Sequence, residues 1–457
     1  MMREEIQAWF DGNRELLVKT SRDLWEHPEA SQQECYACEV LGQLLREQGF
    51  EVSEGSLAGL ATAFEAKWGS GSPKIGFLAE YDALPGLAQD TVSSPAPLDQ
   101  PFGHGCGHNL LGTGAVGAAL ALKAVMEEKK LPGTVYLYGC PSEEIMEGKI
   151  VMTKEHVFDH LDAALSWHPG DYNRASEESY QAMMSVEYHF TGKASHAAMA
   201  PQEGFSALDA VELMDVGVNY LREHVPAGGQ LHYVILNGGQ KPNIVPEKAA
   251  VWQFIRANTT ADLKRIAARL DDIAEGAAKM TGTTFTKKLL SGCNETRIVP
   301  ELVRLMNEVM EQEVPAIDWT EEEKAFSREL LTALGTDREG LAARFGADVW
   351  EHPLDESFSV PTGRTVDILG SSDISDVSYV VPTGMLFAAC YPKGTPNHTW
   401  GVTACSGQSI GQKGMLYAAQ VMAATGLRLV EDAKELEAVK ESFRQALGGI
   451  KYAPVVP

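Results

Sequence analysis

Hydrophobic positions alternate between helical and strand spacing over the first third of the chain. At the N-terminus, "REEIQAWFDGNRELLVKTSRDLWEHP" has the spacing of apolar residues that indicates amphipathic helix. Short apolar runs follow in "KIGFLAEYDALPG", "GTVYLYGCPSEE" and "LDAALSWHPG", and each run leads into a loop that carries acidic residues or histidine. Strands that alternate with helices predict an α/β layer fold, in which sites form where loops leave the carboxyl ends of the strands.

The pattern changes in the middle of the chain. "MMSVEYHFTGK" alternates like a strand and "SALDAVELMDVGVNYLREH" has helical spacing, and after them come two strands, a helix and a last strand, "TTFTKKLL". This order, β-α-β-β-α-β, is typical of a ferredoxin-like unit. We therefore expect residues 184–292 to form a separate unit, inserted between two parts of a larger domain, residues 1–183 and 293–457.

The balance of charge narrows the choice of partners. The 457 residues include 38 Lys and Arg against 63 Asp and Glu, which gives a formal net charge of −25. An acidic surface repels phosphate backbones and anionic lipid headgroups, so neither nucleic acid nor a membrane is the expected partner. The start, "MMREEIQAWF", has acids where a signal peptide is basic and then apolar, and seven cysteines, an odd number, do not indicate a disulfide framework. We expect a cytoplasmic protein.

Two short motifs receive structural interpretations. Cys35 and Cys38 form a C-x-x-C, but they lie in a segment of helical spacing and no second pair completes a zinc ribbon. Gly112, Gly114 and Gly117 match G-x-G-x-x-G, but a loop of histidine and cysteine precedes them where a dinucleotide site needs a strand. We expect these glycines to let a buried helix pack closely.

The stretch "QPFGHGCGHN" places His104, Cys106 and His108 at alternate positions, separated by glycines. Three interpretations are open: a metal site, a nucleophilic cysteine with a histidine base, and a buried turn. A divalent ion needs imidazole, thiolate or carboxylate donors that converge from different elements. Besides this stretch, the chain offers Glu143-Glu144, His168 and His398 in separate loops, which favours the metal site. His104 either supports a ligand or only fills space.

The adjacent carboxylates Glu143 and Glu144 indicate what such a site would do. Two adjacent residues seldom bind one ion in the same manner, so we expect Glu144 to coordinate and Glu143 to face the substrate. A metal lowers the pKa of water, and a nearby carboxylate can take the proton of that water and pass it to a leaving amine. This is hydrolytic chemistry. Asp82 is the candidate carboxylate for fixing the tautomer of a histidine ligand.

Several motifs, in order along nearly the whole chain, resemble one known family. They are "GHGCGHNLLGTGA", "YGCPSEE", "WHPG", "GKASHAAMAP", "PNIVP", "SSDISDVS" and "GTPNHTWG". The family is that of the metal-dependent amidohydrolases, which includes aminoacylase, carboxypeptidase G and plant auxin-amino-acid hydrolases. The resemblance implies a phosphorylase/hydrolase-like α/β catalytic domain with two divalent ions, zinc or manganese. It also implies that the inserted ferredoxin-like unit is a lid that forms a homodimer.

The resemblance assigns roles to particular residues. The implied metal ligands are Cys106, His108, Glu144, His168 and His398. Glu143 becomes the general base, and His196 resembles the lid histidine that reaches a neighbouring protomer's active site and steadies the oxyanion. Asn243 and Arg256 resemble the lid residues that hold substrate, and a guanidinium suits a carboxylate.

The function expected from this resemblance is hydrolysis of an amide that links an acyl or aroyl group to an amino acid, a small-molecule substrate. Asn109 stands where many relatives have aspartate, and Glu80-Tyr81-Asp82 replaces an Asp-x-Asp. Both departures favour the p-aminobenzoyl-glutamate branch of the family. Other hypotheses stay open: a β-alanyl dipeptide or aryl C–N substrate, a thiol hydrolase that uses Cys106, and a non-catalytic member of a two-subunit enzyme.

Overall fold

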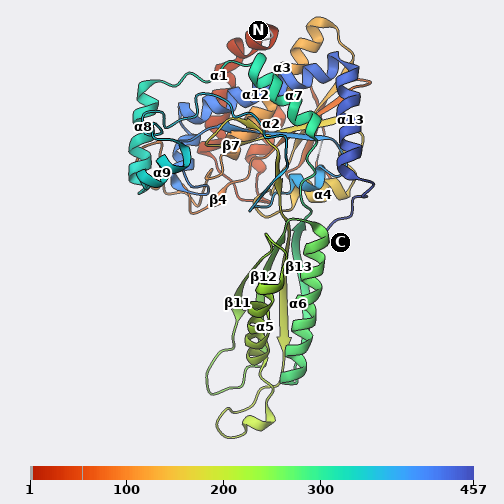
Figure 1. Ribbon diagram of the computed structural model, residues 1–457, viewed down its shortest axis with the longest axis vertical. Helices are drawn as coiled ribbons and strands as arrows, with labels where there is room; N and C mark the ends of the chain where they lie inside the picture. The colour runs from red at the N-terminus through yellow and green to blue at the C-terminus, as the bar shows by residue number, and fades with distance from the viewer. Residues whose placement is uncertain (1–3, 54, 457) are drawn as a thin grey trace. The chain divides into compact units, whose positions relative to one another are not determined.

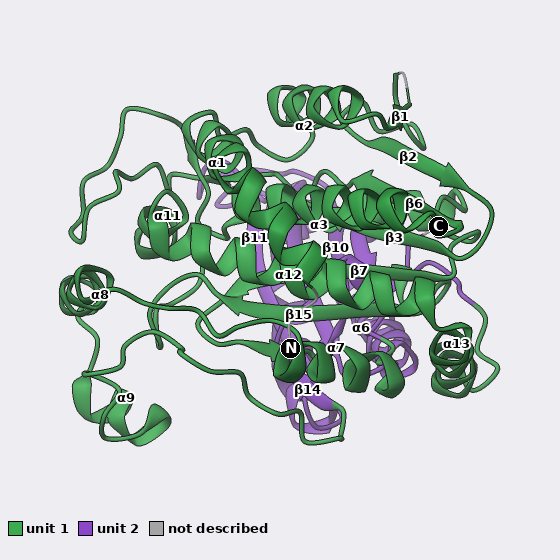
Figure 2. Ribbon diagram, turned by 90° about the horizontal axis from the view of Figure 1, so that it is seen from above, with its two compact units in different colours: residues 1–177, 297–365, 377–451 green, residues 178–296, 366–376, 452–457 purple. Residues whose placement is uncertain are grey.

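The computed structural model describes residues 4–53 and 55–456. It divides into two compact units (Figure 2): unit 1 comprises residues 1–177, 297–365 and 377–451, and unit 2 comprises residues 178–296, 366–376 and 452–457. Each unit has its own hydrophobic core. The expected insertion, residues 184–292, falls inside the long segment of unit 2, which also takes in two short segments that the hydrophobic pattern does not assign to it.

Unit 1 is built on a seven-stranded sheet whose strand order is β1-β2-β6-β3-β7-β15-β8. In that order the strands are Glu51–Val52, Phe64–Ser70, Gly133–Gly139, Lys74–Ala79, Ala163–Gly170, Thr383–Ala389 and Arg174–Ala175. The central strands β6, β3, β7 and β15 run parallel to one another, and the strands outside them run antiparallel to their neighbours. Every residue of β6 is buried, as expected for a parallel strand that is covered on both faces.

Ten helices of unit 1 surround this sheet in the described part of the chain. They are α1 (Glu4–Glu26), α2 (Cys35–Glu47), α3 (His108–Lys129), α4 (Gly148–Lys154), α7 (Pro300–Gln312), α8 (Glu321–Ala333), α9 (Arg338–Phe345), α11 (Trp400–Ser406), α12 (Ser409–Glu431) and α13 (Ala433–Leu447). Helices α3 and α12 lie side by side along the sheet (Figure 2), and α1 packs against both. The short strands β4 (Leu84–Pro85) and β5 (Phe102–Gly103) pair with each other.

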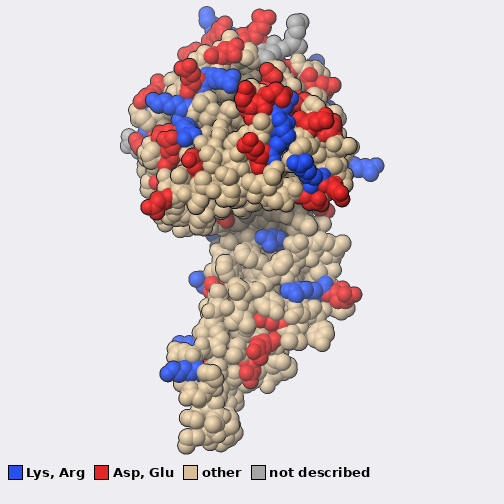
Figure 3. Space-filling view, turned by 90° about the vertical axis from the view of Figure 1, so that its left-hand side faces the viewer, with Lys and Arg blue, Asp and Glu red and all other residues tan. Residues whose placement is uncertain are grey.

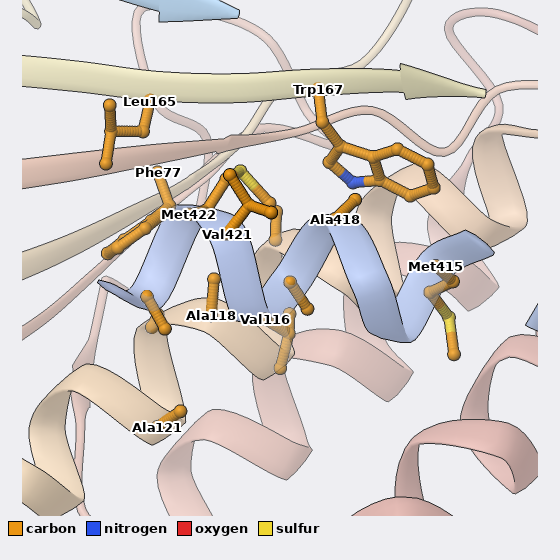
Figure 4. Packing of buried hydrophobic residues seen from close by; sticks show 14 of the residues in the cluster. Phe77, Val116, Ala118, Ala121, Leu165, Trp167, Met415, Ala418, Val421 and Met422 are labelled. Carbon is orange, nitrogen blue, oxygen red and sulfur yellow. The ribbon is translucent and has the colours of Figure 1, made fainter. Parts of the chain in front are cut away.

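Helix α3 forms the centre of the core of unit 1. By length and composition it could cross a membrane, but 89% of its most apolar window is buried inside the fold, as in the core helix of a globular domain. In Figure 4, Val116 and Ala118 of α3 lie beside α12, and Trp167 of β7 also lies close to α12. A Cβ atom on Gly114 would come within 2.8 Å of the indole nitrogen of Trp167. The glycines of the G-x-G-x-x-G motif therefore allow close packing, as the sequence predicts.

Unit 2 has the β-α-β-β-α-β order (Figure 1). Its elements are β10 (Ala182–Thr191), α5 (Ala207–Leu221), β11 (Gln230–Asn237), β12 (Lys248–Ala257), α6 (Thr260–Thr281) and β13 (Thr284–Cys293). The strands form one antiparallel sheet in the order β11-β12-β10-β13. Short pieces complete the unit: β9 (Glu178–Tyr180) pairs with β14 (Val366–Ile368), η1 is Pro201–Glu203, η2 is Arg222–His224, and α10 (Ile374–Val377) begins in its middle segment. The predicted α/β class and the ferredoxin-like order are confirmed.

The two helices of unit 2 cover one face of its sheet. Both begin with a side-chain cap: the hydroxyl of Ser206 accepts from the backbone of Asp209, and Thr259 does the same for Asp262. Along β12, alternate residues such as Val251 and Ile255 are buried in the core of the unit. The residues between them lie on the opposite face of the pleated strand, because successive side chains of a strand point to opposite faces.

One acidic side chain is buried in this core. Asp215 of α5 is 5% exposed, and it accepts a hydrogen bond from Gln253 Nε2 at 3.2 Å. Its other oxygen has no hydrogen-bond partner among the described residues. Burial raises the pKa of Asp215 to about 6. Because the fold disfavours the ionised form, ionisation of Asp215 destabilises the protein as the pH rises from about 4 to about 6, and the penalty persists above that range.

We therefore predict that Asp215→Asn raises the thermal unfolding midpoint at pH 8. The expected gain in unfolding free energy is about 1–3 kcal/mol, and it should disappear near pH 4, where the carboxyl is protonated in both states. Asp272→Asn, at an exposed position of α6, is the matched control and should change little at either pH. Equal destabilisation by Asp215→Asn at pH 4 and pH 8 would contradict the prediction.

Candidate metal centre

The carboxyl ends of the central parallel strands of unit 1 bring the candidate donors together. Strand β3 leads directly into Glu80-Tyr81-Asp82, and β6 leads through Cys140 into Glu143-Glu144. His168 lies near the end of β7, and His398 lies in the loop that follows β15. The strands β6, β3, β7 and β15 are neighbours in that order, so their ends meet along one edge of the sheet.

The first turn of α3 supplies the two remaining donors. His108 is the first residue of α3, and Cys106 lies two residues before it. Gly107, between them, has a left-handed φ of 81°, and a Cβ atom there would approach Pro169 to 2.9 Å. Only glycine adopts this conformation without steric cost, which lets the loop turn tightly into the helix against the end of β7. The backbone amide of His398 donates to Gly105 O at 3.2 Å and holds the fourth loop against this one.

Five donors form two groups that share one sulfur atom. Cys106, His108 and His168 offer ligand atoms within 4.8 Å of one another, and so do Cys106, Glu144 and His398. Cys106 Sγ lies 3.4 Å from His168 Nε2, and Glu144 Oε2 lies 3.6 Å from His398 Nε2. The structure thus brings together all the side chains for which the sequence predicts a ligand role.

Buried atoms without hydrogen-bond partners indicate that the centre is suited to cations. His108 Nε2, Glu144 Oε1 and Glu80 Oε2 are buried and have no hydrogen-bond partner among the described residues. An unsatisfied buried lone pair costs free energy, and a metal ion would satisfy it. Thiolate, imidazole and carboxylate donors together fit a divalent transition metal. The residues therefore fit the kind of ion that the sequence predicts.

Asp82 orients the central histidine. Asp82 Oδ1 lies 2.9 Å from His108 Nδ1, and Asp82 Oδ2 accepts hydrogen bonds from Ser31 Oγ at 2.9 Å and from the amide of Glu144 at 3.0 Å. Burial by itself would raise the pKa of Asp82, but the hydrogen bond and charge of His108 outweigh burial and lower that pKa. A carboxylate only accepts, so Nδ1 carries a proton, and in the neutral imidazole Nε2 keeps the lone pair that can bind an ion. This is the contact that the sequence predicts for Asp82.

The surroundings of His168 and Cys106 also fix the chemical state of these predicted ligands. His168 Nδ1 lies 2.8 Å from the carbonyl oxygen of Pro169, which leaves Nε2 for an ion. Burial and the nearby charge of His108 lower the pKa of His168 to about 4, so this imidazole is neutral at pH 7. Burial and the charge of Glu144 raise the pKa of the Cys106 thiol. A reactive cysteine needs a lowered pKa, so this environment argues against a thiol nucleophile.

Glu143 lies beside the donors rather than within the two groups. Its carboxylate, 8% exposed, is within 4.8 Å of ligand atoms of Glu80 and His108. The loop turns sharply just before it, because Ser142 has a left-handed φ of 61°. The carboxylate of Glu34 accepts the amide of Ser142 at 2.8 Å and holds this turn in place. The predicted division of labour between Glu143 and Glu144 is compatible with these positions.

The sequence left the role of His104 open, and it did not predict the buried charged residues near the centre. His104 Nε2 donates to the carbonyl of Leu24 at 3.1 Å, and His104 belongs to neither donor group, so it is a packing residue. Glu34, Glu80 and Lys149 were not predicted. For Glu80, its position at a strand exit was a signal that it belongs to the centre. Lys149 gave no such signal, because a lysine in a short helix is ordinarily exposed.

The three predicted lid residues belong to unit 2. His196 and Asn243 lie on adjacent loops, because His196 forms a β-bridge with Ile244 and the amide of Ala197 donates to the carbonyl of Asn243 at 3.0 Å. Arg256, on the face of β12 away from the helices, stacks on Phe254 with its guanidinium carbon 5.3 Å from the ring centroid. Their roles toward substrate stay predictions.

Known proteins are similar to this chain over nearly its full length. Residues 76–456 match the model of peptidase family M20/M25/M40. The chain is 37% identical to one subunit of the p-aminobenzoyl-glutamate hydrolase of Escherichia coli (strain K12), over 99% of this chain and 98% of that protein. It is 30% identical to Xaa-Arg dipeptidase of Mus musculus, over 97% of this chain and 92% of that protein.

Solved structures share the fold at low sequence identity. A dinuclear metal binding peptidase of the M20 family from Bacillus subtilis superposes with a TM-score of 0.62, at 18% identity, over 92% of this chain and 99% of that chain. The aminobenzoyl-glutamate utilization protein from Klebsiella pneumoniae gives a TM-score of 0.61, at 16% identity, over 93% and 98% of the two chains. The predicted family resemblance and enzyme class are confirmed. This chain belongs to peptidase family M20/M25/M40 and is a metal-dependent amidohydrolase.

Proposed function

We propose that this enzyme hydrolyses the amide bond between an acyl or aroyl group and an amino acid, with p-aminobenzoyl-glutamate or a close analogue as substrate. The observation that carries the proposal is the pair of donor groups that share Cys106, with Glu143 beside them. The names of the relatives support the substrate class, since one belongs to a hydrolase of p-aminobenzoyl-glutamate. The name of a second relative, Xaa-Arg dipeptidase, supports an amide whose nitrogen belongs to an amino acid.

Two divalent ions would occupy the two groups, and they would supply Lewis-acid polarisation of the scissile carbonyl and a lowered pKa for water. Zinc and manganese both suit the mixture of sulfur, nitrogen and oxygen donors. Glu143 takes a proton from the attacking water and delivers it to the nitrogen of the leaving amine. Asp82 and the carbonyl of Pro169 keep the two buried imidazoles in the tautomers that present Nε2 to the ions.

Residues of unit 2 would complete substrate binding. Arg256 is half-buried, and no carboxylate among the described residues pairs with it, which suits it to the carboxylate of an amino acid substrate. Asn243 would hold the substrate, and His196 would stabilise the oxyanion that forms on the carbonyl. The β-bridge between His196 and Ile244 supports joint action of these two loops.

We also propose a homodimer formed through β11. This strand is at the edge of its sheet, and Tyr233, Val234, Ile235 and Leu236 are 36–52% exposed along it. Figure 3 views unit 2 from the side on which β11 lies in Figure 1, and charged side chains are sparser there than on unit 1. An apolar edge strand is a template on which another strand can pair. If the β11 strands of two copies pair antiparallel about a two-fold axis, the free backbone N–H and C=O groups of both edges form hydrogen bonds.

A different polypeptide is the alternative partner, because the relative from Escherichia coli is one of two kinds of subunit of its hydrolase. The other kind of subunit is 25% identical to this chain over 55% of this chain. We propose a cytoplasmic location, supported by the seven cysteines of the sequence, an odd number that does not indicate a disulfide framework. In that environment the thiol of the metal centre stays reduced.

The test of the proposed function is an assay of the purified chain with p-aminobenzoyl-glutamate and other N-acyl and N-aroyl amino acids, with added Mn²⁺ or Zn²⁺. We expect turnover by the chain alone. Glu143→Gln should keep both ions and lower kcat by about 10²–10⁴-fold, because it removes the proton acceptor. Glu147→Gln, in the same loop, is the control and should keep activity. A wild-type chain that hydrolyses none of these substrates would instead favour a different partner polypeptide.

Chelation separates the metallohydrolase from the thiol hydrolase. We predict that dialysis against a chelator abolishes turnover and that Mn²⁺ or Zn²⁺ restores it, because the ions activate the water and the carbonyl. Full activity of the metal-free protein would revive the hypothesis that Cys106 is a nucleophile.

The dimer is tested by sedimentation. We predict that Val234→Lys converts a dimer into a monomer without loss of helical circular dichroism, since it places a buried charge in the proposed interface. Val360→Lys, at a position that is 66% exposed in unit 1, is the control and should stay dimeric. A wild-type chain that sediments as a monomer at micromolar concentration would disprove the homodimer.

A further inference from the structure

A lysine is completely buried next to the metal centre. Lys149, on α4, has no exposed side-chain surface, and its Nζ lies 2.7 Å from Glu80 Oε1. The side chain of Glu80 is itself only 4% exposed. An ammonium ion and a carboxylate lose much hydration when they are buried, and pairing them often returns no more than that loss. The stability of the fold therefore does not explain why Lys149 and Glu80 form a buried ion pair here.

The second oxygen of Glu80 indicates that reason. Glu80 Oε2 lies 3.5 Å from His108 Nε2, which is too long for a hydrogen bond, and neither atom has a hydrogen-bond partner among the described residues. Because His108 Nδ1 donates to Asp82, Nε2 of the neutral imidazole and Glu80 Oε2 are both placed to bind one cation. A cation between these two buried atoms would satisfy both of them.

We propose that Glu80 is a sixth donor of the metal centre, on the side of His108, and that Lys149 positions it. Glu80, His108 and Glu143 offer ligand atoms within 4.8 Å of one another, and none of the roles implied by the family resemblance includes Glu80. Lys149 holds Oε1, and this leaves Oε2 directed at His108 Nε2. The inference rests on the proposed two-ion hydrolase and names one more residue of its centre.

The charges of the centre support this assignment. Its anionic groups with bound ions are Glu80, Asp82, Glu143, Glu144 and the Cys106 thiolate. Two divalent ions would neutralise four of these charges, and the ammonium of Lys149 lies against the fifth, Glu80. The nearby carboxylate of Glu34 is stabilised separately, by hydrogen bonds from Ser142 and Thr62. Without the lysine, the carboxylate of Glu80 would leave one buried negative charge uncompensated, which is costly in a water-poor environment.

The chain path explains how Lys149 reaches Glu80. Helix α4 begins just after the loop that carries Glu143 and Glu144, and a Cβ atom on Gly148 would lie 1.8 Å from the carbonyl oxygen of Pro141. Only glycine lets the start of the helix pack so closely on that loop. The next residue, Lys149, then enters the interior below the end of β3, the strand that is adjacent to β6 and leads into Glu80.

The experiment measures metal binding and does not depend on a substrate. Metal-free wild-type protein, Glu80→Gln, Lys149→Met and the double variant are titrated with Co²⁺, and bound metal is quantified after equilibrium dialysis. We expect wild type to bind two ions per chain, and Glu80→Gln to weaken one of the two by about 10–100-fold. The thiolate-to-cobalt absorption band should persist, because Cys106 is unchanged, while the d–d bands shift with the lost oxygen donor.

Lys149 is tested by non-additivity. If it acts through Glu80, Lys149→Met weakens the same ion, and the double variant binds no more weakly than Glu80→Gln alone. Additive losses would overturn the positioning role of Lys149. Glu147→Gln is the control and should bind both ions as wild type does. Circular dichroism reports whether each variant folds. If Glu80→Gln does not fold, Glu80→Asp replaces it in the test, because it keeps the charge and shortens the side chain. Glu80→Asp should bind the metal with an affinity between those of wild type and a variant without the carboxylate.

The outcomes separate this inference from the proposed function. Wild type and Glu80→Gln that bind two ions with equal affinity and identical d–d bands would overturn the donor role of Glu80 and leave the two-ion hydrolase intact. A wild-type chain that binds fewer than two ions would overturn both.

Discussion

Lone pairs that face one another in the interior of unit 1 are the constraint on which the rest of this structure depends. His108 Nε2, Glu144 Oε1 and Glu80 Oε2 are buried without hydrogen-bond partners among the described residues. Such an arrangement is unfavourable in an apolar interior unless a cation satisfies it. The hydrogen bond between His108 and Asp82 holds the proton of the neutral imidazole on Nδ1, so Nε2 is the ring atom that can bind an ion. The chemistry of the protein follows from this one requirement.

The parallel sheet meets the requirement by its topology. Strands β6, β3, β7 and β15 are neighbours, and each of their carboxyl ends delivers at least one donor or supporting carboxylate. Helix α3 begins at the same place with His108, and its glycines let it pack against β7 and the rest of the core. Helix α3 is buried in the core and is therefore as apolar as a membrane span. The same close packing holds its first residue, the ligand His108, in position.

Unit 2 is organised by a separate core and an antiparallel sheet with helices on one face. It places His196 and Asn243 on adjacent loops and leaves β11 as an apolar edge. The residues for which we propose a function are thus on loops, on the open face of the sheet and on its edge, while the helices and the inner face form the core. Asp215 is an exception, because a carboxyl in that core weakens the fold when it ionises.

The sequence by itself determined the classes of element, the order β-α-β-β-α-β and the candidate donors Cys106, His108, Glu144, His168 and His398. The spacing of apolar residues and the motifs at strand exits are local patterns, which can be recognised in a single amino-acid sequence. Only the tertiary structure decided that His104 packs against Leu24, since its partner is 80 positions away in the sequence. Likewise, nothing local distinguishes Lys149 from a solvent-exposed lysine, because its burial depends on Glu80, which comes from a different strand. Contacts between distant segments assign such roles, and they exist only after the chain has folded.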